Sequence, residues 1–120
     1  MNYLLDTNAV IYFLSGRLAS ELPVGQCFVS VISEIELLSF KSIDEKAEKA
    51  IREFLGKITV IGLTQPVKER TIQLRRRFAL KTPDAIIAAS AVELGADLLT
   101  NDQALLHIPE VRGRGLELKG

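Results

Sequence analysis

The stretch TPDAIIAASAVELGADLLTND, residues 82–102, decides the fold of this 120-residue chain. It opens with a threonine that can cap a helix and a proline suited to the first helical position. The run 84–94 is apolar nearly all round, which predicts a helix buried on every side. Gly95 is expected to end that helix, and the apolar segment 97–100 is expected to form a buried strand. A buried helix leading into a buried strand is typical of an α/β protein.

Short apolar runs and amphipathic segments elsewhere predict the remaining elements. Strands are expected at residues 2–5, 27–31 and 58–63, with a last edge strand at 115–118. Helices are expected at residues 8–14, 17–22, 33–40, 43–55 and 66–79. Thr7 or Asn8 is expected to cap the first helix. Because strands alternate with helices, the prediction is a mostly parallel sheet of four to five strands with helices on both faces.

The composition points to one globular domain without bulk affinity for nucleic acid. A chain of this length fits one domain, so residues 1–120 are expected to fold as one unit. Its 15 Lys and Arg are balanced by 15 Asp and Glu, although a local basic patch beside an acidic site would cancel in that total. The start of the chain lacks the basic region of a signal peptide, and no stretch is apolar enough to span a membrane. With Cys27 as the only cysteine, we expect a cytoplasmic protein with no membrane association.

Four acidic residues fall where the predicted strands and helices meet. Asp6 follows the first strand directly, and Asp102 follows the strand 97–100. Glu36 lies one turn into the helix after the second strand, and Asp84 begins the most apolar helix. Parallel strands share one carboxyl edge, so three of these acids are expected there, and the helix of Asp84 can bring the fourth to the same crevice.

Such a cluster predicts a site for a hard divalent cation. Carboxylates that share a pocket raise each other's pKa and destabilise the fold unless a counter-charge neutralises them. Mg²⁺ and Mn²⁺ prefer oxygen ligands, keep several waters, and bind a few carboxylates together with a substrate phosphate. A bound ion can polarise a scissile phosphate and lower the pKa of an attacking water. We therefore expect metal-assisted hydrolysis at four residues that are both catalytic groups and metal ligands: Asp6, Glu36, Asp84 and Asp102.

Each of these acids also has a purely local interpretation. Asp6 and Asp102 can cap the helices that follow them, and Asp84 stands in a first helical turn, where the dipole favours an acid. The run SEIE, residues 33–36, fits a capping box in which its last glutamate bonds back to its serine. A shared site is favoured because four junctions would otherwise need an acid for four unrelated reasons.

The same positions and their neighbours resemble the PIN-domain family, in particular the VapC toxins of toxin–antitoxin pairs. The matching pieces are LLDTNAVIY at 4–12, VSVISEIELL at 29–38, TPDAIIAASAVELGADLLTND at 82–102 and HIP at 107–109. The resemblance implies a PIN-like three-layer sandwich that forms a single nuclease domain over residues 1–120. It also implies endonuclease cleavage of RNA with Mg²⁺ or Mn²⁺ as cofactor. The implied partners are an RNA substrate, a second copy in a homodimer, and a cognate antitoxin that blocks the site and joins a larger assembly.

Residue by residue, the resemblance places the family's four metal-site acids on the cluster already described. It selects Glu36 over Glu34, because the glutamate of the family precedes a leucine, here Leu37. The family often has a glycine soon after that leucine, and this chain has none there. The polar positions that the resemblance places around the site are Thr7, Asn8, Thr100 and Asn101.

Basic residues around the helix 66–79 are candidates for RNA contacts, chiefly Arg75, Arg76 and Lys81. The alternative is a solvated helix face, and three consecutive arginines cannot all share one face. Two other functions stay open. A non-catalytic PIN-like interaction subunit usually lacks one or more of the acids, which are all present here. A phosphoacceptor signalling domain has a similar sheet, but it usually pairs adjacent acids early and places a lysine after a late strand, and neither feature is found.

Overall fold

The apolar run at the start of the chain forms β1 (Asn2–Leu5), the central strand of a five-stranded sheet in the computed structural model, which describes residues 1–120. It pairs with β2 (Gln26–Ser30) on one side and with β4 (Asp97–Leu99) on the other. The edges are β3 (Thr59–Ile61), beside β2, and β5 (Gly113–Arg114), beside β4. Every pairing is parallel, and the strand order is β3-β2-β1-β4-β5. The predicted α/β class with a parallel sheet is confirmed.

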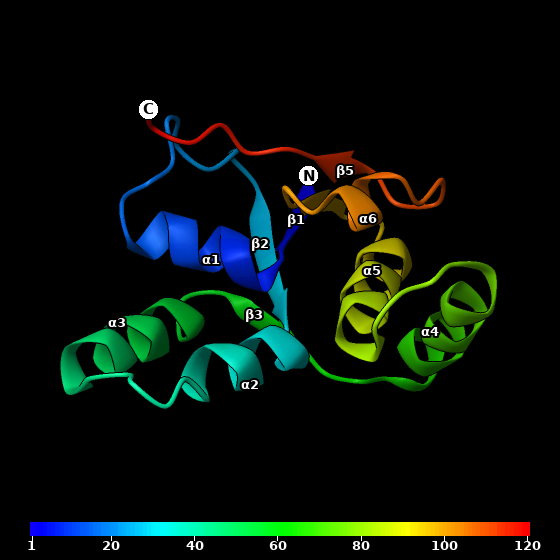
Figure 1. Cartoon of the computed structure of the whole chain (residues 1–120), viewed down its shortest axis with the longest axis horizontal. Helices are drawn as coiled ribbons and strands as arrows, with labels where there is room; N and C mark the ends of the chain where they lie inside the picture. Colours follow the sequence, from blue (N-terminus) through cyan, green and yellow to red (C-terminus); the bar gives the residue numbers. More distant parts are fainter.

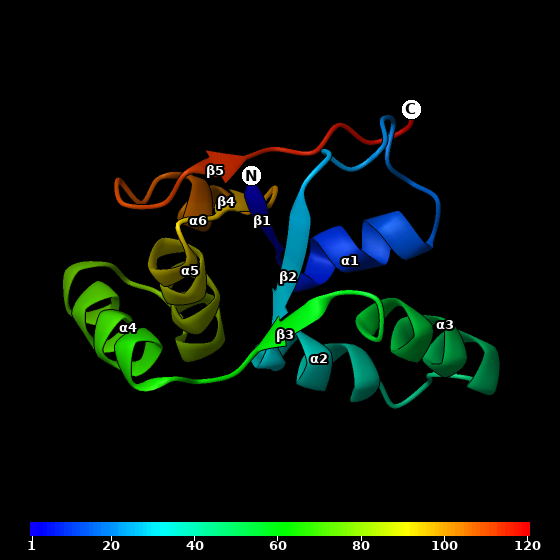
Figure 2. The ribbon, with the colours of Figure 1, turned by 180° about the vertical axis from the view of Figure 1, so that it is seen from behind.

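The helices form two layers, one on each face of the sheet (Figure 1). Their bounds are α1 (Thr7–Leu14), α2 (Val31–Leu38), α3 (Glu45–Leu55), α4 (Gln65–Arg77), α5 (Thr82–Leu94) and α6 (Gln103–Leu106). The chain moves from β1 out to β3 and then returns past β1 to β4, so right-handed crossovers place α1 to α3 on one face and α4 to α6 on the other. The same three layers are visible from behind in Figure 2. None of these helices combines the length and apolar character that crossing a membrane requires.

Alternating strand residues supply two separate apolar cores, because successive side chains of a strand point to opposite faces. Leu4 lies in register with Phe28 and Leu98, and all three pack against the layer of α4 and α5. The next residue along β1, Leu5, packs instead with α1, α2 and α3. Within α5, every residue from Ala85 to Ala91 is buried, as the apolar sequence predicts. Its small side chains let this helix pack closely on the sheet, on α2 and on α4.

The predicted helix over residues 17–22 is wrong. Leu18 forms an antiparallel bridge with Leu118 near the end of the chain, and the backbone N–H of Ala19 donates to the Glu117 carbonyl at 2.8 Å. A helix of six residues gains little from its own hydrogen bonds. The C-terminal tail satisfies these backbone groups instead, through contacts that are distant in the sequence.

The last strand also begins earlier than predicted, at Gly113–Arg114 rather than over 115–118. The side chain of Asn101 accounts for this difference, because it bonds both backbone groups of Leu116. Its Oδ1 accepts from the Leu116 N–H at 2.6 Å, and its Nδ2 donates to the Leu116 carbonyl at 3.0 Å. The backbone of Leu116 is thus paired with a side chain and does not extend the ladder with β4.

Candidate active site

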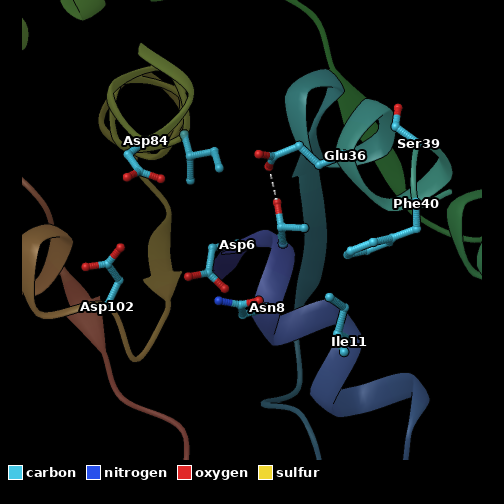
Figure 3. A pocket seen from close by; sticks show the side chains of 10 residues that line it. Asp6, Asn8, Ile11, Glu36, Ser39, Phe40, Asp84 and Asp102 are labelled. Carbon is cyan, nitrogen blue, oxygen red and sulfur yellow. Dashed lines mark hydrogen bonds between the residues drawn. The ribbon is translucent and has the colours of Figure 1, made fainter. Parts of the chain in front are cut away.

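A pocket of about 450 Å³ lies beside the carboxyl ends of β1 and β4, where the order of strands along the chain reverses. In open parallel sheets this position is the usual place for a ligand site. Figure 3 shows Asp84 and Asp102 on one side of the pocket, Asp6 in the middle and Glu36 on the other side. The residues that line it are Asp6, Thr7, Asn8, Ile11, Glu36, Ser39, Phe40, Asp84, Ile87 and Asp102. The structure thus gathers all four acids singled out in the sequence into one pocket.

Asp6 is buried and bonded at both carboxylate oxygens. Its Oδ1 accepts from the Ala9 N–H at 2.7 Å, and its Oδ2 accepts from the Thr100 hydroxyl. Asp6 is therefore the cap of α1, and the predicted cap at Thr7 or Asn8 is wrong because the helix already begins at Thr7. The local role and the shared pocket are not alternatives, since one side chain serves both.

Thr100 joins Asp6 to the loop that carries Asp102. Its buried hydroxyl donates to Asp6 and accepts from the Asp102 N–H at 3.0 Å. Asp102 in turn accepts from the Ala104 N–H at 2.9 Å and so caps the short helix α6. Asn101, by contrast, uses its side chain on the C-terminal tail and does not line the pocket.

Glu36 is held by α1 rather than by its own helix. The Thr7 hydroxyl donates to its Oε1 at 2.6 Å. The alternative interpretation of Glu36, a capping box with Ser33, is excluded because α2 begins at Val31 and its cap is Ser30, whose Oγ accepts from Ile32 N–H at 3.0 Å. Ser33 therefore lies inside the helix, fully buried, with its Oγ 2.9 Å from the Thr7 hydroxyl.

Asp84 lies in the first turn of α5, and its side chain makes no hydrogen bond to a protein group. The helix begins at Thr82, so the predicted cap at Thr82 is also wrong, and Lys81 occupies the cap position without a side-chain bond. Burial raises the pKa of Asp84 above its usual value of 3.8, and the charges of Asp102 and Glu36 raise it further, while Lys81 opposes them. A first helical turn normally favours a negative charge, so burial and repulsion prevail at this position.

The electrostatics of the pocket are those of one acidic cluster without a cation among its lining residues. Burial raises the pKa of Asp6, and the charges of Asp102 and Asp84 add to this effect. The hydrogen bonds from Thr100 and Ala9 stabilise the charged form and lower the pKa in part. Each of the four acids therefore repels at least one of the others electrostatically across the pocket.

The donor set of the pocket fits a hard cation. It offers carboxylate oxygens together with hydroxyl and amide groups, and no thiolate or imidazole. Mg²⁺ and Mn²⁺ favour such oxygens, and they use few protein ligands because they keep several waters. In the conformation observed, no three of the His, Cys, Asp and Glu side chains are placed to hold one ion between them. A bound ion would thus require these carboxylates to move, or water molecules to act as intermediaries.

None of the basic residues expected to contact RNA lines the acidic pocket. Arg75 and Arg76 line a separate hollow on α4, together with Thr71, Ile72 and Thr82. Neither forms an ion pair, whereas Arg77 pairs with Glu110 at 2.5 Å and Arg70 pairs with Glu93 at 2.9 Å. Lys81 precedes α5 and its charge acts on Asp84. None of these three cations is neutralised by an ion pair, and Lys81 is the one whose charge acts on the acidic site.

Sequence reasoning missed four residues that line the pocket: Ile11, Ser39, Phe40 and Ile87. Helical spacing carries a signal for them. Ile87 follows Asp84 by three residues, and Phe40 follows Glu36 by four, so each shares a helix face or its extension with a pocket acid. Ile11, Phe40 and Ile87 add apolar side chains to the lining of an acidic pocket, which composition alone does not indicate.

The fold and this pocket define an α/β protein with an acidic site at the switch point of a parallel sheet. The sequence model of the PIN-domain family matches residues 3–111, which is most of the chain. The chain belongs to the PIN-domain family.

The chain is also similar to several solved structures. A chain of a toxin–antitoxin complex from Klebsiella pneumoniae is 32% identical, with a TM-score of 0.75 over 91% of this chain and 94% of the other. VapBC2 from Rickettsia felis, bound to a promoter DNA fragment, has the same fold at 20% identity, with a TM-score of 0.81 over 98% and 100% of the two chains. DNA-bound VapBC from Salmonella typhimurium is similar at 21% identity, with a TM-score of 0.80 over 96% and 98%. A search of curated proteins finds no match. The predicted resemblance to VapC-type PIN domains is confirmed.

Replacing Asp84 by asparagine is expected to stabilise the metal-free protein at neutral pH. Its pKa is raised on folding, so the native state binds the proton more tightly, and stability falls as the pH rises from 3.8 through the raised value. The burial and the repulsion that raise this pKa are both reduced by the water around a half-buried side chain. We therefore expect the melting temperature in EDTA to rise by about 1–3 °C at about pH 7. The difference should vanish below the unfolded pKa.

The matched control is Asp44→Asn, which makes the same change at the exposed cap of α3, outside the pocket. Calorimetry with and without Mg²⁺ completes the test. The wild type should gain more from Mg²⁺ than the Asp84→Asn protein does. Equal melting temperatures for wild type and Asp84→Asn at every pH would show that folding does not raise the pKa of Asp84.

Proposed function

We propose that this protein is a metal-dependent endoribonuclease, the VapC-like toxin of a type II toxin–antitoxin system, with residues 1–120 as a single nuclease domain. The main support is the convergence of four carboxylates, from four separate parts of the chain, on one pocket that has no cation among its lining residues. Membership of the PIN-domain family agrees with this activity. The substrate is RNA, and the proposed place of action is the cytoplasm.

Asp6, Asp84, Asp102 and Glu36 are the proposed ligands of Mg²⁺ or Mn²⁺. Such an ion supplies a Lewis acid for the scissile phosphate and lowers the pKa of the attacking water. The protein itself holds the proposed ligand side chains in position around that ion. Asp6 is fixed by two hydrogen bonds, whereas Asp84 has no protein partner and can reorient toward a ligand. Thr100 keeps the loop of Asp102 in register with Asp6.

Removing the charge of Asp6 or Asp84 is expected to abolish most of the activity. Purified Asp6→Asn and Asp84→Asn proteins should cleave a labelled RNA about 100-fold more slowly or worse, because each loses an oxygen charge that balances a divalent ion. EDTA should stop the wild type, and added Mg²⁺ or Mn²⁺ should restore it. The matched control is Glu53→Gln, an exposed acid of α3 far from the pocket in the fold. Full RNA cleavage by Asp6→Asn, or in excess EDTA, would refute the proposal.

We place RNA contacts on Arg75, Arg76 and Lys81, whose charges are not used by ion pairs within the protein. Arg75 also donates to the Leu80 carbonyl at 3.2 Å, which holds its side chain against the loop between α4 and α5. Thr82 borders both arginines, and Asp84 follows it on the same helix. An RNA backbone can thus pass over the end of α4 and reach the acids.

Arg76→Ala is expected to weaken substrate binding more than chemistry. The KM for RNA should rise about 3- to 10-fold with little change in kcat, and the salt dependence of binding should fall by about one phosphate contact. Steady-state cleavage at several salt concentrations measures both effects. Lys49→Ala, an exposed cation on the opposite helical layer, is the matched control. The same KM for Arg76→Ala and the wild type would remove this part of the proposal.

A cognate antitoxin is the proposed inhibitor, since the similar structures are toxin–antitoxin complexes. The surface beside the acids suits such a partner. An apolar groove of about 400 Å³ runs between α1, α2 and α3, and it shares Ile11 and Phe40 with the acidic pocket. A segment with apolar side chains in the groove and a cation over the acids would close the site. The toxin is further proposed to be a homodimer and to form a larger assembly with the antitoxin.

Leu14→Asp tests the groove, because Leu14 lines it without lining the acidic pocket. The inhibitor to use is the cognate antitoxin, to be sought in a small reading frame beside the gene of this protein. It should inhibit Leu14→Asp at least about 10-fold more weakly than the wild type, because an ion buried against apolar groups is costly. Val24→Asp, at a side chain that is 96% exposed, should be inhibited normally. Equal inhibition of the two variants would place the antitoxin elsewhere.

A further inference from the structure

The hydroxyl of Thr7 is bonded on two sides, and the direction of both bonds can be assigned. It lies 2.6 Å from Glu36 Oε1, a length typical of a hydroxyl that donates to a carboxylate. It also lies 2.9 Å from the Ser33 hydroxyl. A threonine hydroxyl has one proton and uses it on Glu36, so it must accept from Ser33. The bonds therefore run from Ser33 to Thr7 to Glu36 (Figure 3 shows the second of them).

The two ends of this chain of bonds differ in their freedom. Ser33 is 0% exposed and sits inside α2, so its hydroxyl is held away from water behind Thr7. Glu36 is on the exposed part of the same helix, one turn later, and a glutamate loses about 1.5–2 kcal/mol of rotamer entropy when it is ordered. Its charge also repels that of Asp84 across the pocket. Without a donor, both effects would turn the Glu36 carboxylate away from the other acids.

Thr7 is placed to oppose this tendency because of its neighbour in the chain. Asp6 caps α1, and Thr7 is the first residue of that helix. The cap that fixes Asp6 therefore also fixes the hydroxyl that reaches Glu36 on α2. Two acids from different helices are held at a set separation through adjacent residues.

We propose that Thr7 is a positioning residue, which acts with Ser33 behind it to hold the Glu36 carboxylate in the acidic pocket. Its effect on RNA cleavage rests on the proposed function, whereas its effect on Glu36 does not. Thr7 need not touch the substrate. The role requires only a hydroxyl at this place, with a buried donor behind it.

Thr7→Val and Thr7→Ser separate the hydroxyl from the packing. Valine keeps the shape and loses the donor, so kcat should fall about 10- to 100-fold, while the KM for RNA changes less than about twofold. Serine keeps the donor and should retain kcat within about threefold. Thr59→Val makes the same chemical change at an exposed residue of β3 that has no side-chain hydrogen bond, and it should match the wild type.

A double-mutant cycle shows whether Thr7 acts through Glu36. In single-turnover reactions with excess enzyme, the double variant Thr7→Val/Glu36→Gln should cleave RNA almost as fast as the single variant Glu36→Gln. If Thr7→Val lowers kcat by the same factor with and without the Glu36 charge, or leaves kcat intact in the wild type, the proposal is overturned.

A second measurement does not depend on cleavage or on a metal. In NMR spectra of the metal-free protein, Glu36 should occupy one side-chain rotamer in the wild type and in Thr7→Ser. It should average over several rotamers in Thr7→Val, with the rest of the spectrum preserved. A fixed Glu36 in Thr7→Val overturns the proposal even if the protein is a nuclease. An averaged Glu36 supports it even if the nuclease assignment fails.

Discussion

The repulsion among four carboxylates is the constraint around which the rest of this structure is arranged. Asp6, Glu36, Asp84 and Asp102 come from four elements, and none has a cation beside it in the pocket. Burial and mutual repulsion raise the pKa of Asp6 and Asp84, which means that the folded chain disfavours their charges. Apolar clusters of 16 and 9 buried residues on the two faces of the sheet hold the elements in place against this repulsion.

The chain orders its acids with hydrogen bonds rather than with counter-ions. Asp6 and Asp102 each accept a backbone N–H at the start of a helix, and Thr100 links one to the other. Such bonds stabilise the charged forms without filling the pocket with a positive side chain. They leave the acids free to interact with a cation from outside. The carboxylates that cap these two helices are thus the same carboxylates that line the pocket.

The tail of the chain belongs to this arrangement although it lies beyond the matched PIN domain, which ends at residue 111. Asn101 stands between two residues of the site, and its side chain binds both backbone groups of Leu116. The tail then pairs with the segment after α1 through Leu18 and Leu118. The loop that carries Asp102 is therefore supported by the C-terminal tail, which does not line the pocket.

The sequence by itself determined the strands, most helices and the four acids. Apolar runs such as residues 2–5 and the all-apolar stretch of α5 have one plausible place in a parallel sheet, and an acid after a buried strand must lie at its carboxyl edge. Only the tertiary structure decided the partners of these groups. Residues 17–19 pair with a tail about a hundred residues away, and Glu36 bonds to Thr7 on another helix rather than to Ser33 on its own. Local patterns reveal which backbone and side-chain groups need partners, but distant segments that compete for the same bonds are known only once the chain has folded.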